Sequence, residues 1–94
     1  MLDIQVEDGG LVRLIGRLDA SESDRAQSVL RGLNTSLTLD CSRLDYISSA
    51  GIGVFIETYK RLHASGQTFK LLHLLPRVRN IFAYAGLDRI LTIE

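Results

Sequence analysis

The sequence predicts a single α/β domain built on a mostly parallel β-sheet. The chain opens with a hairpin pattern, and strand-like segments then alternate with amphipathic helix-like segments that carry their own start and stop signals. With 94 residues, the chain suffices for one domain with one hydrophobic core. The predicted order is β-β-α-β-α-β-α-β, with the helices packed against the sheet. Only the opening hairpin is expected to be antiparallel, because helical, right-handed crossovers join the later strands.

A glycine turn between two apolar segments predicts the opening hairpin. Residues 2–7 alternate between apolar and polar side chains, which is typical of a half-buried strand. Residues 8–10, Asp-Gly-Gly, favour a tight turn because glycine accepts the positive φ that such turns need. Residues 11–16 are therefore expected to form the second strand, antiparallel to the first.

The first helix is predicted to begin near residue 19. Asp19 or Ser21 can cap its N-terminus, and Gly32 and Asn34 end it. Apolar side chains recur at helical spacing, so we expect them to form its buried stripe. These residues are Ala26, Val29, Leu30 and Leu33.

The middle of the chain predicts a central strand followed by the second helix. Residues 36–41 are rich in β-forming side chains, and the strand is expected to continue loosely to residue 47. The second helix runs from the segment after this strand to about residue 65, where Gly66 supplies a left-handed C-terminal cap. Its predicted buried stripe is Ile52, Phe55, Ile56, Tyr59 and Leu62, and its predicted water-facing residues are Glu57, Lys60 and Arg61.

The last part of the chain predicts a strand, a helix and a final short strand. Residues 68–74 are mostly apolar and unbroken, as expected for a strand covered on both faces. Pro76 opens the third helix and Gly86 closes it. Residues 90–93 form the last strand. The inward-facing residues predicted for the third helix are Val78, Ile81, Phe82 and Ala85.

Composition limits the classes of function. The chain has 11 Lys and Arg residues against 11 Asp and Glu residues, so it lacks the positive excess that nucleic-acid binding needs. Its single cysteine, Cys41, excludes an internal disulfide and fits a reducing compartment. The N-terminal residues do not resemble a signal peptide, and no stretch approaches the ~20 apolar residues of a membrane helix. We therefore expect a cytoplasmic protein that binds neither nucleic acid nor membrane.

No combination of residues predicts an active site, a metal site or a cofactor site. His63 and His73 lack the accompanying Cys, His or Glu spacing of a metal site. Gly51-Ile52-Gly53 lacks the third glycine of a dinucleotide fingerprint, and no P-loop lysine follows it. Ser49 does not stand in a nucleophile elbow, because the residue two positions before it is Ile47 and not glycine. The sequence therefore predicts a protein that is not an enzyme.

Residues 48–53, Ser-Ser-Ala-Gly-Ile-Gly, are unusual for the start of a helix. Ser48 or Ser49 can cap the helix by accepting a hydrogen bond from a first-turn amide, which is worth ~1 kcal/mol. Gly51 and Gly53 each lower helix propensity by roughly 1 kcal/mol relative to alanine. Their missing side chains permit close approach by a neighbouring element or by a partner. Residue chemistry alone favours capping over a functional site here.

Three segments of the chain resemble the STAS family, the domains of sulfate transporters and anti-sigma factor antagonists. Gly16-Arg17-Leu18-Asp19 resembles the Gly-x-Leu-Asp motif that follows the second strand of the family. Residues 44–53 resemble the central motif, which carries the phosphorylated serine. Residues 75–82, followed by 85–87, resemble the closing segment. The resemblance covers nearly the whole chain and implies one STAS domain over residues 1–94.

The resemblance also implies roles for individual residues. Aligning the glycines places the phosphoserine of the family at Ser49, and Ser48 is the competing site because the usual Asp before the phosphoserine is absent. Asp19 is implied to lie near Ser49, and its alternative role is to cap the first helix. Ile47 is expected to pack in the core. The implied partner-binding residues are Asp19, Tyr46, Ser48, Ser49, Ala50, Gly51 and Gly53.

In functional terms, the resemblance implies a bacterial anti-sigma factor antagonist that regulates transcription by partner switching. The unmodified antagonist binds an anti-sigma factor, which is a serine kinase of the histidine-kinase-like ATPase fold, and so frees the sigma factor. Phosphorylation of Ser49 ends this complex, and a PPM-type serine phosphatase resets it. ATP and metal belong to these partners, so the chain itself needs no cofactor, and we expect it to be a monomer.

Two other interpretations are open. The chain could instead be a non-catalytic STAS subunit of a larger assembly, such as a stress-signalling scaffold or a lipid-transport complex, because a fold does not fix a function. The intact serine at position 49 favours the antagonist over this alternative. A nucleotide-binding module would rest on the resemblance alone, since the chain has no phosphate-binding loop.

Overall fold

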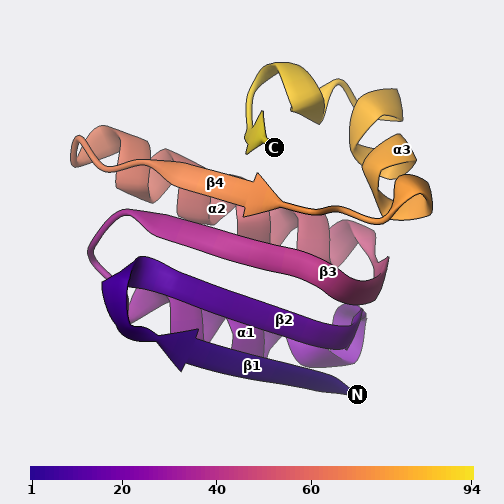
Figure 1. Ribbon diagram of the computed structural model, residues 1–94, viewed down its shortest axis with the longest axis horizontal. Helices are drawn as coiled ribbons and strands as arrows, with labels where there is room; N and C mark the ends of the chain where they lie inside the picture. Colours follow the sequence, from indigo (N-terminus) through magenta and orange to yellow (C-terminus); the bar gives the residue numbers. More distant parts are fainter.

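The computed structural model describes all of residues 1–94 and arranges five strands in one sheet, in the order β1-β2-β3-β4-β5 (Figure 1). Strands β1 and β2 are antiparallel and all later neighbours are parallel, which confirms the predicted topology. The strands are β1 (Leu2–Glu7), β2 (Leu11–Leu18), β3 (Leu37–Ile47), β4 (Phe69–Leu72) and β5 (Thr92–Ile93). The helices are α1 (Ala20–Arg31), α2 (Ser49–Ala64) and α3 (Pro76–Tyr84), with short 3₁₀ turns at Asp8–Gly10 and Leu87–Arg89.

Helices α1 and α2 lie side by side across one face of the sheet, and the hydrophobic core fills the space between them and the strands (Figure 1). Leucines from β2, β3 and β4 are fully buried there. Phe55 of α2 packs against Phe69 of β4 and Phe82 of α3, with ring centroids 6.2 and 6.0 Å apart. Helix α3 therefore shares the same core. No helix in the chain combines the length and the apolar character needed to cross a membrane.

The opposite face of the sheet carries no helix (Figure 1), so the prediction of a strand covered on both faces is wrong. Strand β4 has only four residues. Phe69 and Leu71 are buried toward α2, whereas Lys70 and Leu72 face the open side and are half-buried. His73, which was predicted to lie inside this strand, is exposed and follows it with a φ of 60°. This left-handed backbone ends the strand two residues earlier than predicted.

Helix α2 begins and ends close to the predicted positions, but its buried face is rotated from the predicted stripe. Val54 and Thr58 are buried although the prediction did not include them. The reason is that α2 packs against α1 as well as against the sheet, so its buried arc turns toward both. Thr58 fits there because its hydroxyl donates a hydrogen bond to the Val54 carbonyl oxygen at 2.8 Å. The predicted core residues that are only half-buried are Ile52, Ile56 and Tyr59.

The other two helices differ from their predicted stripes in a similar way. In α1, Val29 is only half-buried, whereas Ser23, which was not predicted to face the core, is buried. The Ser23 hydroxyl donates a hydrogen bond to the Asp19 carbonyl oxygen at the start of the helix. In α3, Ile81 and Ala85 are exposed, because this short helix buries only its Val78 and Phe82 side. Leu33, which was also predicted to belong to the buried stripe of the first helix, lies beyond the end of α1 and is half-buried.

Glu57 and Arg61, which were predicted to face water, instead connect α2 to α1. The Glu57 carboxylate accepts hydrogen bonds from Arg31 Nε at 2.8 Å and Nη2 at 3.1 Å. Arg61 donates to carbonyl oxygens at the C-terminal end of α1, including that of Leu30 at 2.7 Å. Of the three predicted water-facing residues, only Lys60 is exposed, whereas Glu57 and Arg61 are half-buried. These contacts fix the separation of the two helices that begin at the candidate site.

Candidate functional site

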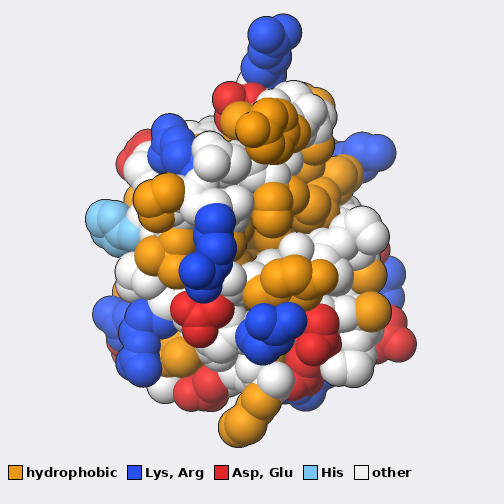
Figure 2. Space-filling model, turned by 90° about the vertical axis from the view of Figure 1, so that its right-hand side faces the viewer, with side chains coloured by type: hydrophobic (Ala, Val, Ile, Leu, Met, Phe, Trp, Pro, Cys, Tyr) orange, Lys and Arg blue, Asp and Glu red, His pale blue; other side chains and the backbone are white.

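Two strand-to-helix junctions lie side by side at the carboxyl edge of the sheet, which is the side of the molecule that faces the viewer in Figure 2. Leu18, the last residue of β2, pairs with Ile47, the last residue of β3. The Ser48 amide also donates a hydrogen bond to the Leu18 carbonyl oxygen at 2.9 Å. Helices α1 and α2 therefore start next to each other, with Asp19 and Ser48 as their N-caps. The parallel pairing brings these residues together from distant parts of the sequence.

Ser48 and Ser49 have different positions at the N-terminus of α2. Ser48 is the N-cap, and its Oγ accepts a hydrogen bond from the Gly51 amide at 3.1 Å. Ser49 is the first helical residue; it is exposed, and its hydroxyl makes no hydrogen bond within the chain. Ala50 is exposed as well. The predicted capping role is confirmed for Ser48, and the free hydroxyl at this junction is that of Ser49.

Asp19 caps α1, and its carboxylate belongs to the same edge of the sheet at which α2 begins. Its Oδ1 accepts hydrogen bonds from the Ser21 hydroxyl at 2.7 Å and from the Glu22 amide at 3.2 Å. The bond from Ser21, supported by the one from the Glu22 amide, lowers the pKa of the Asp19 carboxyl below its ordinary value. The capping interpretation of Asp19 is confirmed, and its contact with a partner stays a prediction.

The two glycines in the first turns of α2 have opposite surroundings. A Cβ on Gly51 would lie 2.8 Å from Ile47 Cγ1, 2.8 Å from Leu18 Cγ and 2.9 Å from the Leu18 carbonyl oxygen. Gly51 is buried and lets α2 approach the ends of β2 and β3, so the packing of its own chain explains this glycine without a partner. A Cβ on Gly53 would meet nothing within 4 Å. Gly53 is exposed and leaves the surface of α2 open beside the junction.

An aromatic and cationic pair lies on the strands that lead into the junctions. Tyr46 is 37% exposed, and the Arg17 guanidinium lies 4.3 Å from the centroid of its ring. Arg17 and Tyr46 face each other in the register of β2 and β3. Sequence reasoning missed Arg17, although it lies inside the Gly-x-Leu-Asp motif and the strand register points to it. Ile47 is buried in the core, as predicted.

Helix α3 adds a hydrophobic area to the same side of the molecule. Arg77, in its first turn, donates a hydrogen bond from Nε to the Asp45 carbonyl oxygen at 3.0 Å and so ties α3 to β3. Figure 2 shows hydrophobic side chains gathered mainly on the upper part of this side, where α3 lies, and charged side chains of both signs below. Elsewhere in this part of the chain, Tyr84 at the end of α3 and Ile90 after the Leu87–Arg89 turn are 91% and 54% exposed, which is high for such large side chains.

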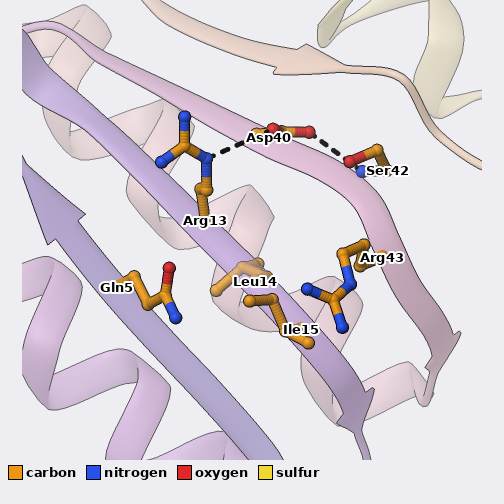
Figure 3. A pocket seen from close by; sticks show the side chains of 7 residues that line it. All are labelled: Gln5, Arg13, Leu14, Ile15, Asp40, Ser42 and Arg43. Atoms are coloured by element: carbon orange, nitrogen blue, oxygen red, sulfur yellow. Dashed lines mark hydrogen bonds and ion pairs between the residues drawn. The ribbon is translucent and has the colours of Figure 1, made fainter.

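A hollow of about 190 Å³ lies on the open face of the sheet (Figure 3). It lies at a β-bulge between two paired positions, Arg13 with Asp40 and Ile15 with Arg43. Between these pairs, β3 contains one residue more than β2. Arg13 Nε lies 3.6 Å from Asp40 Oδ2, and Arg13 also pairs with Glu7. The Ser42 amide donates to Asp40 at 3.0 Å, and this bond is the main cause that lowers the pKa of the Asp40 carboxyl. Most charges around the hollow are therefore already paired.

The remaining reactive side chains lie away from the junctions. Cys41 is buried in β3, and burial raises the pKa of its thiol to about 12, so the thiol stays protonated near neutral pH. His63 is exposed on α2 and stacks on Tyr59, with ring centroids 5.4 Å apart. No group of three or more His, Cys, Asp or Glu side chains is placed to hold a metal ion.

Comparison with known proteins gives one family and several relatives. The family model described as "Mlab, STAS domain" matches residues 3–92. A protein of Bordetella bronchiseptica described as an anti-sigma factor antagonist, BtrV, is 38% identical over 65 residues, which are 69% of this chain and 55% of that protein. An anti-sigma F factor antagonist of Lysinibacillus sphaericus is 28% identical over 91 residues, covering 92% of this chain and 78% of that protein. The match thus spans about half the length of the first relative.

The fold also matches solved structures. The structure of the Bacillus cell fate determinant SpoIIAA in its phosphorylated form aligns with a TM-score of 0.73 and 20% sequence identity, covering 100% of this chain and 91% of that chain. At this identity the likeness concerns the fold. It agrees with the order of strands and helices described above.

Proposed function

Because the chain belongs to the STAS domain family, we propose that it is an anti-sigma factor antagonist whose docking is switched off by phosphorylation of Ser49. The observation that carries this proposal is the free, exposed hydroxyl of Ser49 at the N-terminus of α2. The hydroxyl of Ser48 is engaged as the helix cap, so Ser49 offers a kinase the more accessible oxygen. The names of the relatives from Bordetella bronchiseptica and Lysinibacillus sphaericus support this class of function.

A phosphate on Ser49 is compatible with the folded domain. The first-turn amides of α2 point toward this position, and the helix dipole favours a negative charge there. Ser49 is exposed, so the phosphate displaces no core side chain. Phosphorylation is therefore expected to leave the domain folded and to act on the surface that a partner contacts.

The same phosphate is unfavourable in a docked complex. It adds nearly two negative charges to the edge of the sheet that already carries the Asp19 carboxylate. Burying such a group against a partner without a matching cation costs several kcal/mol. A hundredfold loss of affinity requires only about 2.7 kcal/mol. A local charge effect is thus sufficient for the switch, and no large conformational change is needed.

The proposed cycle involves two partner enzymes. The anti-sigma factor, a serine kinase of the histidine-kinase-like ATPase fold, binds the unmodified chain and phosphorylates Ser49. A PPM-type serine phosphatase removes the phosphate. The proposed docking surface comprises Asp19, Tyr46, Ser49, Ala50 and Gly53, with Ser48 holding the helix start and Arg17 supporting Tyr46.

Incubation with the anti-sigma factor of the same organism and ATP, followed by mass spectrometry, tests the modification site. We expect one phosphate, on Ser49, in the wild type and in Ser48→Ala, and none in Ser49→Ala. Ser48→Ala is the matched control because it removes the neighbouring hydroxyl. A phosphate found on Ser48 in the wild type would contradict the assignment.

Affinity measurements on variants test the switch itself. Ser49→Ala should bind the anti-sigma factor with and without ATP, because it cannot be modified. Ser49→Asp should bind weakly, because it places a permanent charge on the docking surface. Equal binding of both variants in titration calorimetry would sink the proposed mechanism.

Two exposed apolar side chains, one at the end of α3 and one after the Leu87–Arg89 turn, favour a second candidate, a non-catalytic STAS subunit of a larger assembly. Tyr84 and Ile90 are the kind of large exposed apolar groups that a permanent neighbour covers. In that case Ser49 variants should leave assembly unchanged, whereas Tyr84→Ser should release the chain from its complex in size-exclusion chromatography.

A further inference from the structure

A polar groove of about 440 Å³ runs between α1 and α2 and starts beside Ser49. The two helices run parallel, because both begin at the carboxyl ends of neighbouring parallel strands. Ala50, the residue after Ser49, lines one end of the groove. The lining residues are Ser23, Asp24, Gln27, Ser28 and Arg31 from α1 and Ala50, Gly53, Val54 and Glu57 from α2.

An ion pair across the two helices lies at the far end of the groove. Arg31 and Glu57 form a two-bond contact across the helices, with N–O distances of 2.8 and 3.1 Å. The lining residues on α1 extend from Ser23 to Arg31, which at 1.5 Å per residue is a length of about 12 Å. An extended polypeptide rises about 3.3 Å per residue, so about four residues span this length.

Gln27 carries an unused hydrogen-bond donor in the wall of this groove. Its Nε2 is buried and has no hydrogen-bond partner in the chain. A buried donor without a partner is destabilising, and most such groups in folded proteins are paired. Asp24 and Ser28, also in the groove, are exposed and have no side-chain hydrogen bond within the chain. Between the N-terminal end of the groove and the Arg31–Glu57 pair, the side chains of Asp24, Gln27 and Ser28 therefore carry polar groups that make no hydrogen bond within the chain.

Gly53 leaves the α2 wall of the groove open. Nothing lies within 4 Å of the place where its Cβ would be, and an exposed helix position favours alanine over glycine. Glycine here therefore contributes nothing to the stability of the free chain. It does allow another backbone to approach α2 closely, one helical turn away from Ser49.

We propose that a short segment of the anti-sigma factor occupies this groove in the complex, and that the Gln27 side chain turns outward so that its Nε2 donates a hydrogen bond to a carbonyl oxygen of this segment. This inference rests on the proposed function, because it identifies the occupant by continuity with the docking surface around Ser49. A peptide carbonyl supplies the acceptor that the buried amide lacks, and the segment reaches the groove past Ala50 and Gly53. Phosphorylation of Ser49 then blocks the mouth of the groove as well as the junction.

Gln27→Met tests the donor, with Gln5→Met as the matched control. Methionine keeps a similar length but removes the unpartnered amide, so the free chain should unfold about 4 °C or more higher. The same change should weaken binding of the anti-sigma factor about fivefold to tenfold, because one hydrogen bond is lost. Gln5 lies on the opposite face of the sheet (Figure 3), so Gln5→Met should leave the affinity unchanged.

Gly53→Leu tests the open wall by a second route. A Cβ at this exposed position meets nothing within 4 Å, and leucine has a higher helix propensity than glycine, so the midpoint of thermal unfolding should stay the same or rise. It should fill the groove and reduce affinity at least tenfold. If both Gln27→Met and Gly53→Leu bind like the wild type while Ser49→Asp binds weakly, the groove inference is wrong and the proposed function stands. If Ser49→Asp also binds like the wild type, the proposed function itself fails.

Discussion

The β2–α1 and β3–α2 junctions share one backbone design but carry different chemistry. In each, a buried strand residue precedes an N-cap whose side chain accepts the amide hydrogen three residues later: Asp19 from Glu22, and Ser48 from Gly51. The first helical residue is Ala20 in one helix and Ser49 in the other. The first junction therefore carries a permanent carboxylate and no free hydroxyl. The second has a neutral cap and a free hydroxyl beside it.

This difference shows how a modifiable position can be separated from a structural one. At the second junction, the cap and the hydroxyl that we propose as phosphoacceptor are adjacent residues, so modifying Ser49 leaves the cap of α2 in place. At the first junction the Asp19 carboxylate is already charged near neutral pH, and its pKa lies below the ordinary value. A phosphate on Ser49 would therefore add charge to an edge of the sheet that already carries one carboxylate.

The largest expected effect on stability comes from filling the space at Gly51. Gly51→Ala places a Cβ under 3 Å from three atoms, including a backbone oxygen, and overpacking of this kind outweighs the gain in helix propensity. We expect a net loss of about 2 kcal/mol in urea unfolding. Gly53→Ala, with open space around it, should instead gain up to about 1 kcal/mol. Equal effects of the two substitutions would show that Gly51 does not hold α2 against the two strands.

A smaller effect separates the two serines. Ser48→Ala removes the cap of α2 and should cost about 1 kcal/mol of unfolding free energy. Ser49→Ala removes a hydroxyl without partners and should stay within about 0.5 kcal/mol of the wild type. Chemical denaturation of both variants measures the difference. A larger loss for Ser49→Ala than for Ser48→Ala would reverse the roles assigned to them.

The smallest expected effect is a pH dependence confined to the first junction. The bond from Ser21 lowers the pKa of Asp19, so the ionised carboxylate stabilises the folded chain above the ordinary carboxyl pKa of 3.8. That contribution is lost as the pH falls through the lowered value of the folded state. The stability gap between the wild type and Asp19→Asn should therefore shrink on acidification. The difference in stability between the wild type and Ser48→Ala should not change with pH, because the Ser48 cap is neutral. If both differences shrank equally on acidification, the proposed charge difference between the two junctions would be wrong.

The topology and the main junction could be predicted from the sequence because they depend on local signals. Alternating apolar residues, Asp-Gly-Gly, Pro76 and Gly66 mark strands, turns and helix ends whatever surrounds them. The segment around Ser48 and Ser49 stood out for the same reason: two glycines in the first turns of a helix oppose its propensity.

The buried faces and the groove could not be predicted, because they depend on which elements meet. Thr58 is buried only because α2 packs against α1, and Leu72 is half-buried only because no helix covers the open face of the sheet. Likewise, Gly51 and Gly53 look alike in sequence, and only the positions of Leu18 and Ile47 distinguish them. The unpartnered amide of Gln27 has no signature in the sequence at all.

The most direct test is a titration of the anti-sigma factor with this chain carrying phosphoserine at position 49, beside the unmodified chain. Circular dichroism of the two forms should coincide, since the phosphate sits on an exposed helix start. The phosphorylated form should bind at least about a hundredfold more weakly, which corresponds to about 2.7 kcal/mol. Equal dissociation constants for the two folded forms would contradict the proposal that charge at Ser49 controls docking.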